Sequence, residues 1–249
     1  MTALDFTPAS GAAPWSRRLV AHTAVELRAL LRNGEQLLLT IGIPTILLVV
    51  FAKAPIADLP KPRIDFLVPG VLALAVMSTA FTGQAIATGF ERRYAVLRRL
   101  GTTPLSRPTL LAAKTLAVLG VEALQVAVLC VVGLLLGWSP RGNPFEVVGL
   151  LLLGTVAFSA LGLLLAGTLR AEATLAAANL IYLLMLVAGG VMFPLGDFSS
   201  GVRHVLEALP LGALADGLRS ATPTTRDWLV LAGWALGSGA LAARFFRWD

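Results

Sequence analysis

The segment 91–114 reads ERRYAVLRRLGTTPLSRPTLLAAK and lies between two long apolar stretches. Six of the twenty basic residues of the chain fall in it, so it is the most basic part of the sequence. Treated as a helix, residues 91–100 have an apolar side and a charged side. The apolar side comprises Val96, Leu97 and Leu100, and the charged side comprises Glu91, Arg92, Arg98 and Arg99. This pattern predicts a short amphipathic helix on a membrane surface, with its basic groups toward water and anionic headgroups.

The end of this helix and the start of the next one can also be predicted. Pro104 cannot continue a helix and restricts the residue before it, so we expect the surface helix to end there. Ser106 can then cap the following helix. A plain basic loop that fixes membrane topology is the simpler interpretation. It explains the charge but not the ordered sequence Leu-Gly-Thr-Thr-Pro-Leu-Ser at 100–106.

The composition indicates a membrane protein. The chain has 249 residues, of which 57% are hydrophobic and 14% are charged, and its mean hydropathy is +0.81. Soluble domains average roughly 25% charged residues. The net charge of +6 is best explained by anionic lipid and an acidic partner, rather than nucleic acid, because the basic residues flank apolar stretches. The single cysteine, Cys130, excludes an internal disulfide framework.

A membrane span needs roughly 20 apolar residues, and the chain contains six candidates. The predicted spans are 36–52, 66–90, 109–137, 145–168, 174–193 and 227–243. We expect a disordered tail over 1–14 without a cleavable signal peptide, and one membrane domain over 15–249. Of the basic residues, 13 fall on the N-terminal side of the membrane and 7 on the other. This asymmetry predicts that both termini are cytoplasmic.

Amphipathic helices are also expected outside the spans. One is predicted over 15–33, where it would lie at the interface before the first span. Its apolar side comprises Leu19, Val20, Leu27, Leu30 and Leu31, and its basic side comprises Arg17, Arg18, Arg28 and Arg32. Two short helices that dip into the outer leaflet are predicted within 194–226, where Pro210-Leu211-Gly212 interrupts an apolar stripe.

Motifs for catalysis are missing from the sequence. There is no G-x-x-x-x-G-K-[ST] phosphate loop, so energy must come from a partner or an ion gradient. His22 and His204 stand outside any zinc-hydrolase motif, and no predicted span holds a histidine that could activate a serine. We therefore expect no catalytic residue and no metal site.

Glu122 is the one acidic residue deep within a predicted span, roughly 20 Å from the start of that span. Gln125 follows nearly one helical turn later. A carboxylate in this position is costly. Either it lines a substrate path that favours cationic or polar drugs, or it binds a neighbouring helix, with Gln84 or Asn179 as the partner.

The segment 91–107 resembles the cytoplasmic loop of type-2 ABC export permeases, in particular the drug-resistance branch that includes daunorubicin exporter permeases. The similarity rests on Glu91-Arg92-Arg93, Leu97-Arg98-Arg99-Leu100 and Thr103-Pro104-Leu105-Ser106-Arg107. In that family the loop carries a coupling helix that docks on a separate ATP-binding subunit. The coupling residues implied here are Glu91, Arg92, Leu97, Arg98, Leu100, Gly101, Thr103, Pro104, Leu105 and Ser106.

Two further parts of the chain are similar to the family at the level of pattern. The family has an elbow helix at the position of 15–33, and this helix also touches the ATPase. Phe193-Pro194, Pro210-Leu211 and Arg219 match the outer helices between spans five and six. The aromatic residue usual in the first outer helix is missing, and Arg203-His204 lies nearby instead.

The resemblance implies an all-α polytopic protein with six transmembrane helices, an elbow helix, a coupling helix between spans two and three, and short re-entrant helices between spans five and six. It implies a non-catalytic permease subunit of an ABC exporter in the bacterial plasma membrane. ATP and Mg²⁺ would bind the partner chain, and this chain would bind no cofactor. The substrate would be hydrophobic or amphipathic, such as a drug, a lipid or a glycan.

Six spans without an internal repeat make half of a transport pathway, so we expect a second permease copy. A homodimer is predicted, and a heterodimer with a sister permease stays open. The alternative function is a gradient-driven secondary transporter that works without an ATPase. Such a transporter would need ionisable groups in several spans, and only Glu122 qualifies.

Overall fold

The computed structural model describes residues 11–54, 60–191 and 198–246, and every regular element in these ranges is helical. The elements are α1 (Trp15–Arg32), α2 (Gly34–Lys53), α3 (Arg63–Val76), the π-helix η1 (Met77–Gly83), α4 (Gln84–Arg93), α5 (Val96–Leu100), α6 (Arg107–Leu135), α7 (Pro144–Thr168), α8 (Ala171–Ala188), α9 (Ser200–Glu207), α10 (Pro210–Arg219) and α11 (Thr225–Phe245). Residues 1–10 of the predicted tail and the Phe193-Pro194 pair lie outside the described residues.

Among the residues that the structure describes, five helices are long and apolar enough to cross a membrane. They are Gly34–Lys53, Arg63–Arg93 (the continuous α3, η1 and α4), Arg107–Leu135, Pro144–Thr168 and Thr225–Phe245. Each matches one of the predicted spans. The remaining prediction, 174–193, corresponds to α8, whose apolar part over Ala171–Val187 is shorter than the other five. The protein is therefore a multi-pass membrane protein, and the six-span layout stays a prediction.

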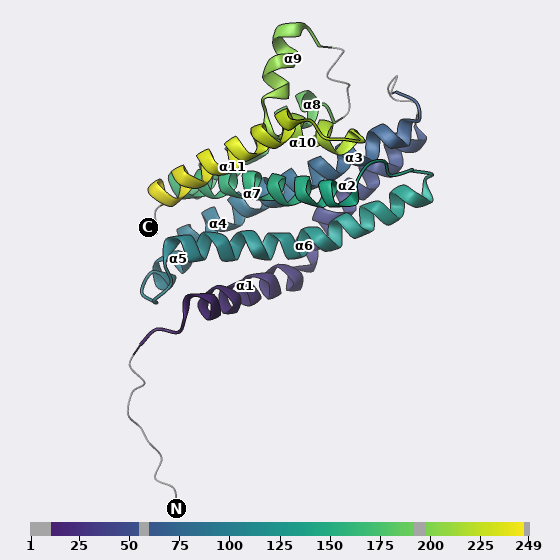
Figure 1. Ribbon diagram of the computed structural model, residues 1–249. Coiled ribbons are helices and arrows are strands. Elements are labelled where there is room, and N and C mark those ends of the chain that lie inside the picture. The colour runs from purple at the N-terminus through teal and green to yellow at the C-terminus, as the bar shows by residue number, and fades with distance from the viewer. Residues whose placement is uncertain (1–10, 55–59, 192–197, 247–249) are drawn as a thin grey trace, which may run out of the picture.

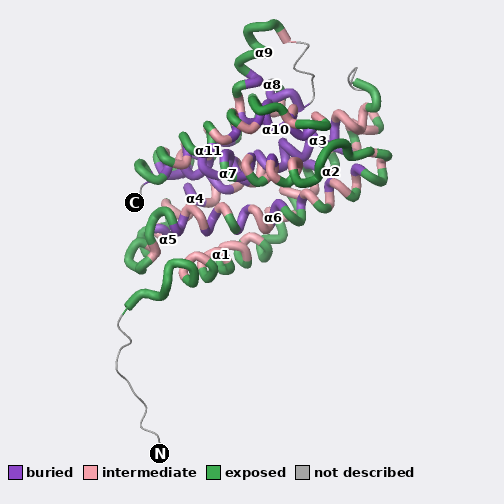
Figure 2. The backbone as a smooth tube through the Cα atoms, viewed as in Figure 1, coloured by how far each residue is buried: buried purple, intermediate pink, exposed green. Residues whose placement is uncertain are grey.

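The centre of the bundle is α3. Ten consecutive residues, Leu67 to Val76, are buried, as expected for a helix that is apolar on all sides. Figure 1 shows α6, α7 and α11 running side by side, with α1 along the outside of α6. In Figure 2 burial is concentrated in α3, α7 and α10, whereas α1 is largely exposed. The chain thus wraps α3 in other helices.

Close helix contacts depend on small residues. A Cβ added at Gly162 of α7 would lie 2.7 Å from the carbonyl oxygen of Phe81 in η1, so only glycine allows this approach.

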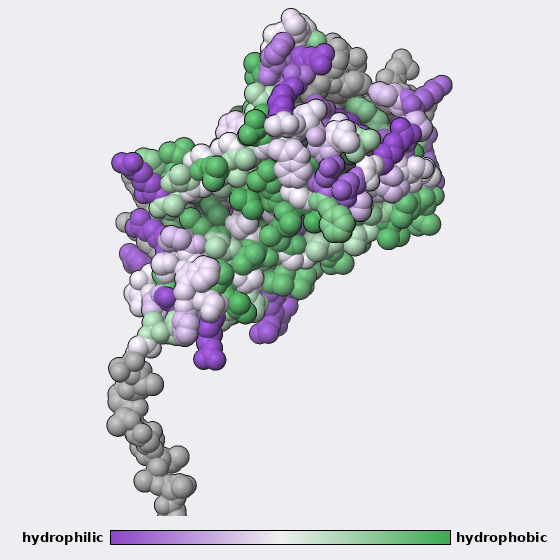
Figure 3. Space-filling view, in the orientation of Figure 1, coloured by the Kyte–Doolittle hydropathy of each residue, from purple (hydrophilic) through white to green (hydrophobic). Residues whose placement is uncertain are grey.

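The outer surface of the bundle exposes large apolar residues. Leu135 and Phe145 are more than 80% exposed, and Figure 3 shows hydrophobic residues across the middle of one face with hydrophilic residues gathered toward its ends. This pattern fits a bilayer around the bundle.

Two short helices follow residue 198, as predicted, but the break between them lies elsewhere. Pro210-Leu211-Gly212 forms the start of α10 instead of interrupting a helix, because proline is well tolerated at the first helical position. The helix ends at Arg219, which lies over the Phe66 ring at 3.7 Å from its centroid. The apolar stripe predicted before Pro210 comprises Val202, Val205, Leu206 and Leu209. Of these, Leu206 is buried, whereas Val202 and Val205 are exposed.

Candidate functional site

The predicted surface helix is divided by a turn. Helix α4 continues to Arg93, Ala95 adopts a left-handed conformation with φ of 59°, and α5 begins at Val96. A left-handed residue other than glycine is uncommon and redirects the chain. The prediction of one amphipathic helix over 91–100 is therefore wrong.

Helix α5 packs against the bundle mainly through Leu97. Leu97 is fully buried in a cluster with Leu110, Leu163 and Phe246, which come from α6, α7 and the end of the chain. Val96 is 41% exposed and does not share the packed side with Leu97, contrary to the prediction.

Arg98 and Arg99 of α5 are exposed, as the amphipathic pattern predicts. Leu100 and Leu105 are partly buried against the Leu97 cluster. Helix α5 therefore presents its basic residues to the outside and is fixed to the bundle by leucines.

Glu91 and Arg92 do not lie on the water-facing side predicted for them. They belong to α4, and the orientation of this helix directs their side chains toward α6 and α7. Arg92 donates to the carbonyl oxygens of Ala166 at 2.8 Å and Leu169 at 2.6 Å, at the end of α7. Glu91 pairs with Lys114 of α6.

The surface helix ends before Pro104, contrary to the prediction. Residues 101–104 form turns. The Thr102 hydroxyl donates to the carbonyl oxygen of Arg99 at 2.7 Å, and the Thr103 hydroxyl donates to that of Leu100 at 2.6 Å. These bonds satisfy carbonyls of the last helical turn, so the helix stops at Leu100.

The turn 101–104 is held by α1 and by the start of α6. Ser106 caps α6 as predicted, accepting from the backbone N–H of Thr109 at 3.4 Å. Trp15 of α1 donates its indole N–H to the Thr109 hydroxyl at 3.0 Å. Arg18 of α1 donates to the carbonyl oxygen of Pro104. One end of α1 is thus attached to the segment after α5.

The side of α1 that faces α6 differs from the predicted apolar side. Leu27 packs so closely that a Cβ added at Gly120 of α6 would lie 2.8 Å from its Cδ1. Val20 and Leu31, however, are 67% and 44% exposed. The inward side also carries polar residues, among them Glu26, which pairs with the buried Lys114. Of the four predicted basic residues, Arg17, Arg28 and Arg32 are exposed, whereas Arg18 is half-buried.

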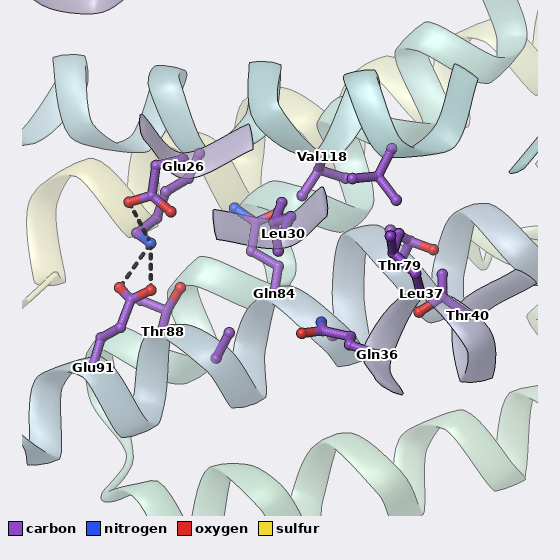
Figure 4. A pocket seen from close by; sticks show the side chains of 14 residues that line it. Glu26, Leu30, Gln36, Leu37, Thr40, Thr79, Gln84, Thr88, Glu91 and Val118 are labelled. Atoms are coloured by element: carbon purple, nitrogen blue, oxygen red, sulfur yellow. Dashed lines mark hydrogen bonds and ion pairs between the residues drawn. The ribbon is translucent and has the colours of Figure 1, made fainter. Parts of the chain in front are cut away.

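Lys114 joins three helices and is only 5% exposed. Its Nζ lies 3.0 Å from Oε1 of Glu26 in α1 and 2.7 Å from Oε2 of Glu91 in α4. Nε2 of His22 lies 3.2 Å from Oε1 of Glu26. Figure 4 shows Glu26 and Glu91 on either side of the ammonium group. We call Glu26, Glu91 and Lys114 the ion cluster.

The charge of Glu26 is stabilised by this arrangement. Burial raises the pKa of the Glu26 carboxyl, but its contact with His22 and the charge of Lys114 outweigh burial and hold the pKa at about 2. Sequence reasoning missed the cluster. The available signal was a single lysine within an apolar helix, since such residues usually have a partner.

A cavity of about 40 Å³ adjoins the ion cluster (Figure 4). Among its lining residues, Gln84 is 6% exposed and Thr88 is fully buried. The Nε2 of Gln84 and the hydroxyl of Thr88 have no hydrogen-bond partner among the described residues. Its lining is mostly apolar apart from such groups, and the volume has room for about three water molecules at about 10–15 Å³ each.

Glu122 and Gln125 both form contacts between helices. Glu122 is 4% exposed and accepts from the Thr155 hydroxyl of α7. Gln125 is fully buried, accepts from the Thr79 hydroxyl at 3.0 Å and donates to the carbonyl oxygen of Thr40 at 2.7 Å. Both side chains thus join neighbouring helices.

Neither partner predicted for Glu122 is the one observed. Gln84 accepts instead from the Ser159 hydroxyl at 2.6 Å. Asn179 donates to the carbonyl oxygen of Leu175 at 2.9 Å within its own helix. No group of three or more metal-binding side chains occurs in the part of the chain that the structure describes.

Comparison with known proteins adds one finding. A family model described as "ABC-2 type transporter" matches residues 17–222, from the first turn of α1 to just beyond α10. The match includes α5, the turn 101–104 and the ion cluster. A search of the curated proteins finds no match.

Proposed function

This chain belongs to the ABC-2 type transporter family and is thus the membrane permease component of an ABC transporter; we propose that it works in export. It would move a hydrophobic or amphipathic molecule, such as a drug, lipid or glycan, out of a bacterial cytoplasm across the plasma membrane. ATP and Mg²⁺ would bind a separate ATPase chain, and this chain would bind no cofactor.

The attachment of α5 is the observation that carries the proposal. A segment that transmits force must be both accessible and rigidly fixed. Arg98 and Arg99 are accessible, whereas Leu97 is fully buried. The following turn is fixed through the bond from Arg18 to the Pro104 carbonyl. We therefore assign α5 and residues 101–106 as the coupling segment, and α1 as the elbow helix.

A path from the coupling segment into the bundle follows from these contacts. Movement of α5 would displace Leu97 and hence Leu110 of α6 and Leu163 of α7, because all three share one cluster. The ion cluster would carry the same movement to α1, since Lys114 binds both Glu26 and Glu91. The spans would then rearrange and release the substrate outward.

The proposed topology has six spans and two cytoplasmic termini. Trp15 near the start of the described chain and Phe246 at its end both contact the α5 end of the bundle. An even number of crossings is needed for both ends to lie on one side. This supports α8 as the sixth span, completing one permease domain from residue 15 onward.

A second permease copy would complete the pathway, and we propose a homodimer. Helices α2 and α8 have the exposed apolar side chains that a partner or lipid would cover, including Ile46, Leu180 and Leu184. Six spans would form one half of the transport pathway, as the sequence predicts.

Co-purification of the tagged permease with candidate P-loop ATPases tests the proposal. The wild type should capture one ATPase, and Gly101→Arg and Leu105→Asp should lose it while still inserting in the membrane. Gly201→Arg in α9 is the matched control, because a side chain at Gly201 meets nothing within 4 Å. If the wild type captures no ATPase yet transports with an ion gradient alone, it works as a gradient-driven transporter and the proposed coupling to an ATPase is wrong.

A further inference from the structure

A basic hollow lies beside α5. It has a volume of about 430 Å³ and is lined by the end of α4, by α5 and by the connection between α7 and α8. Four arginines line it together with one carboxylate: Arg92, Arg93, Arg98, Arg170 and Glu172. The formal charge of the lining is therefore +3.

Two of these arginines are occupied within the chain and two are available. Arg92 donates to two carbonyl oxygens of α7 and its connection, and Arg93 is paired with Glu172. The side chains of Arg98 and Arg170 are exposed and form no hydrogen bond or ion pair with any residue that the structure describes, although the charge of Arg170 acts on the nearby Glu172. Both residues line the hollow, and a guanidinium group offers donors for an external anion.

The surroundings of the hollow are those of a membrane boundary. Tyr94 is 67% exposed and stacks on Phe90, with ring centroids 6.2 Å apart. Exposed tyrosines are enriched at the level of lipid headgroups. Helix α8 begins at Ala171 in the wall of the hollow, and its first turns expose Leu175. A polar hollow thus adjoins an apolar helix surface.

We propose that this hollow binds the phosphate of an anionic phospholipid, with Arg98 and Arg170 as the ligands and the acyl chains along α8. Arginine matches phosphate with two parallel hydrogen bonds. Basic pockets at the cytoplasmic ends of spans suit anionic headgroups. The assignment to the cytoplasmic leaflet rests on the topology proposed above. The bound lipid would join α5 to the α7–α8 connection. The fixation of the coupling segment would therefore depend on the lipid composition of the membrane.

Native mass spectrometry of the full chain provides the test. The purified permease is delipidated in a neutral detergent and titrated with phosphatidylglycerol or phosphatidylcholine. The wild type should bind phosphatidylglycerol preferentially. Arg170→Gln should weaken this binding about fivefold, and Arg98→Gln with Arg170→Gln about 25-fold, at about 1 kcal/mol for each arginine near a membrane surface.

The matched control is Arg17→Gln with Arg28→Gln, which removes two exposed arginines of α1 that do not line the hollow. Equal losses in the two double variants would mean general attraction to basic charge and would overturn the proposal. Displacement of the lipid by an equal concentration of glycerol phosphate would assign the site to free phosphate instead, which also contradicts it.

The lipid test is independent of the ATPase. Lipid binding to the hollow would persist even if no ATPase were captured, so the two proposals can fail separately. If phosphatidylglycerol does not bind and Arg170→Gln alone abolishes ATPase capture, the hollow is a protein contact and the lipid assignment is wrong.

Discussion

Lys114 is the residue on which the contact between α1, α4 and α6 depends. It is buried between two carboxylates from two other helices. Removing one member of a buried ion pair leaves an uncompensated charge, which costs more than the pair contributes. The residue therefore acts as a fixed junction of these three helices.

Lys114→Met should destabilise the protein by about 3 to 5 kcal/mol, because Glu26 and Glu91 lose their counter-charge. Thermal unfolding in detergent measures this. Lys53→Met at the end of α2 is the control, since Lys53 is exposed. Neutralising both carboxylates together with Lys114→Met should recover most of the lost stability. If the stability does not recover, charge is not the reason for the effect of Lys114→Met.

Acid should remove part of this stabilisation. The pKa of Glu26 falls from its ordinary value of 4.5 to about 2 in the folded protein. Because the pKa is lower in the folded than in the unfolded protein, the ionised carboxyl stabilises the fold at pH values above the unfolded-state pKa. This stabilisation is lost as the pH falls toward 2. The melting temperature of the wild type should therefore exceed that of Glu26→Gln at pH 7, and the difference should shrink at pH 3. A constant difference would show that ionisation of Glu26 does not matter.

Glu122 is expected to act as a contact between α6 and α7. Thr155→Val should destabilise the protein by about 1 kcal/mol, the usual size of a hydrogen bond between membrane helices. Glu122→Gln can still accept from Thr155 and should change stability by less than that. Unfolding and transport are measured on both variants. A folded Glu122→Gln protein that loses export of cationic substrates would assign Glu122 to the substrate path instead.

Among the elements, α1 has the contact surface that sequence periodicity describes least well. Its apolar residues predict an amphipathic helix, and the helix forms over nearly the predicted range. Its orientation depends on Lys114 and Gly120, almost a hundred residues away. Periodicity contains no information on these partners, so Val20 and Leu31 were placed on the wrong side.

Gly120→Leu should separate α1 from α6. A Cβ at Gly120 would already meet Leu27, and a full leucine side chain has no space there. The exposed arginines of α1 should then be cut faster by trypsin. Gly237→Leu in α11 is the control, since its Cβ meets nothing within 4 Å. Unchanged cleavage would mean that α1 does not depend on this contact.

The α4–α5 region shows which local features the sequence predicts. The cap by Ser106 was predicted correctly, because a serine before a helix has one common role. The turn at Ala95 has no glycine or proline to mark it, and the early helix end depends on two threonine hydroxyls.

The sequence did not predict the partner of Glu122, because many polar residues lie in neighbouring spans and their spacing does not select among them.

For the whole molecule, hydropathy predicts the spans well because the bilayer requires long apolar helices. Five of six predicted spans meet this requirement, and α8 is shorter. The family match and the exposed apolar surface agree on a permease. The contact with an ATPase is a property of the assembly, and the proposed function depends on it.

Cross-linking from α5 to the ATPase tests this contact most directly. Cys130 is the only cysteine, so Cys130→Ser gives a background for single cysteines. Gly101→Cys, modified with a photo-cross-linker in membranes that contain the candidate ATPase, should yield a permease–ATPase product, and Gly201→Cys should not. A product from Gly201→Cys, or none from Gly101→Cys when the complex co-purifies, would contradict docking at the coupling segment.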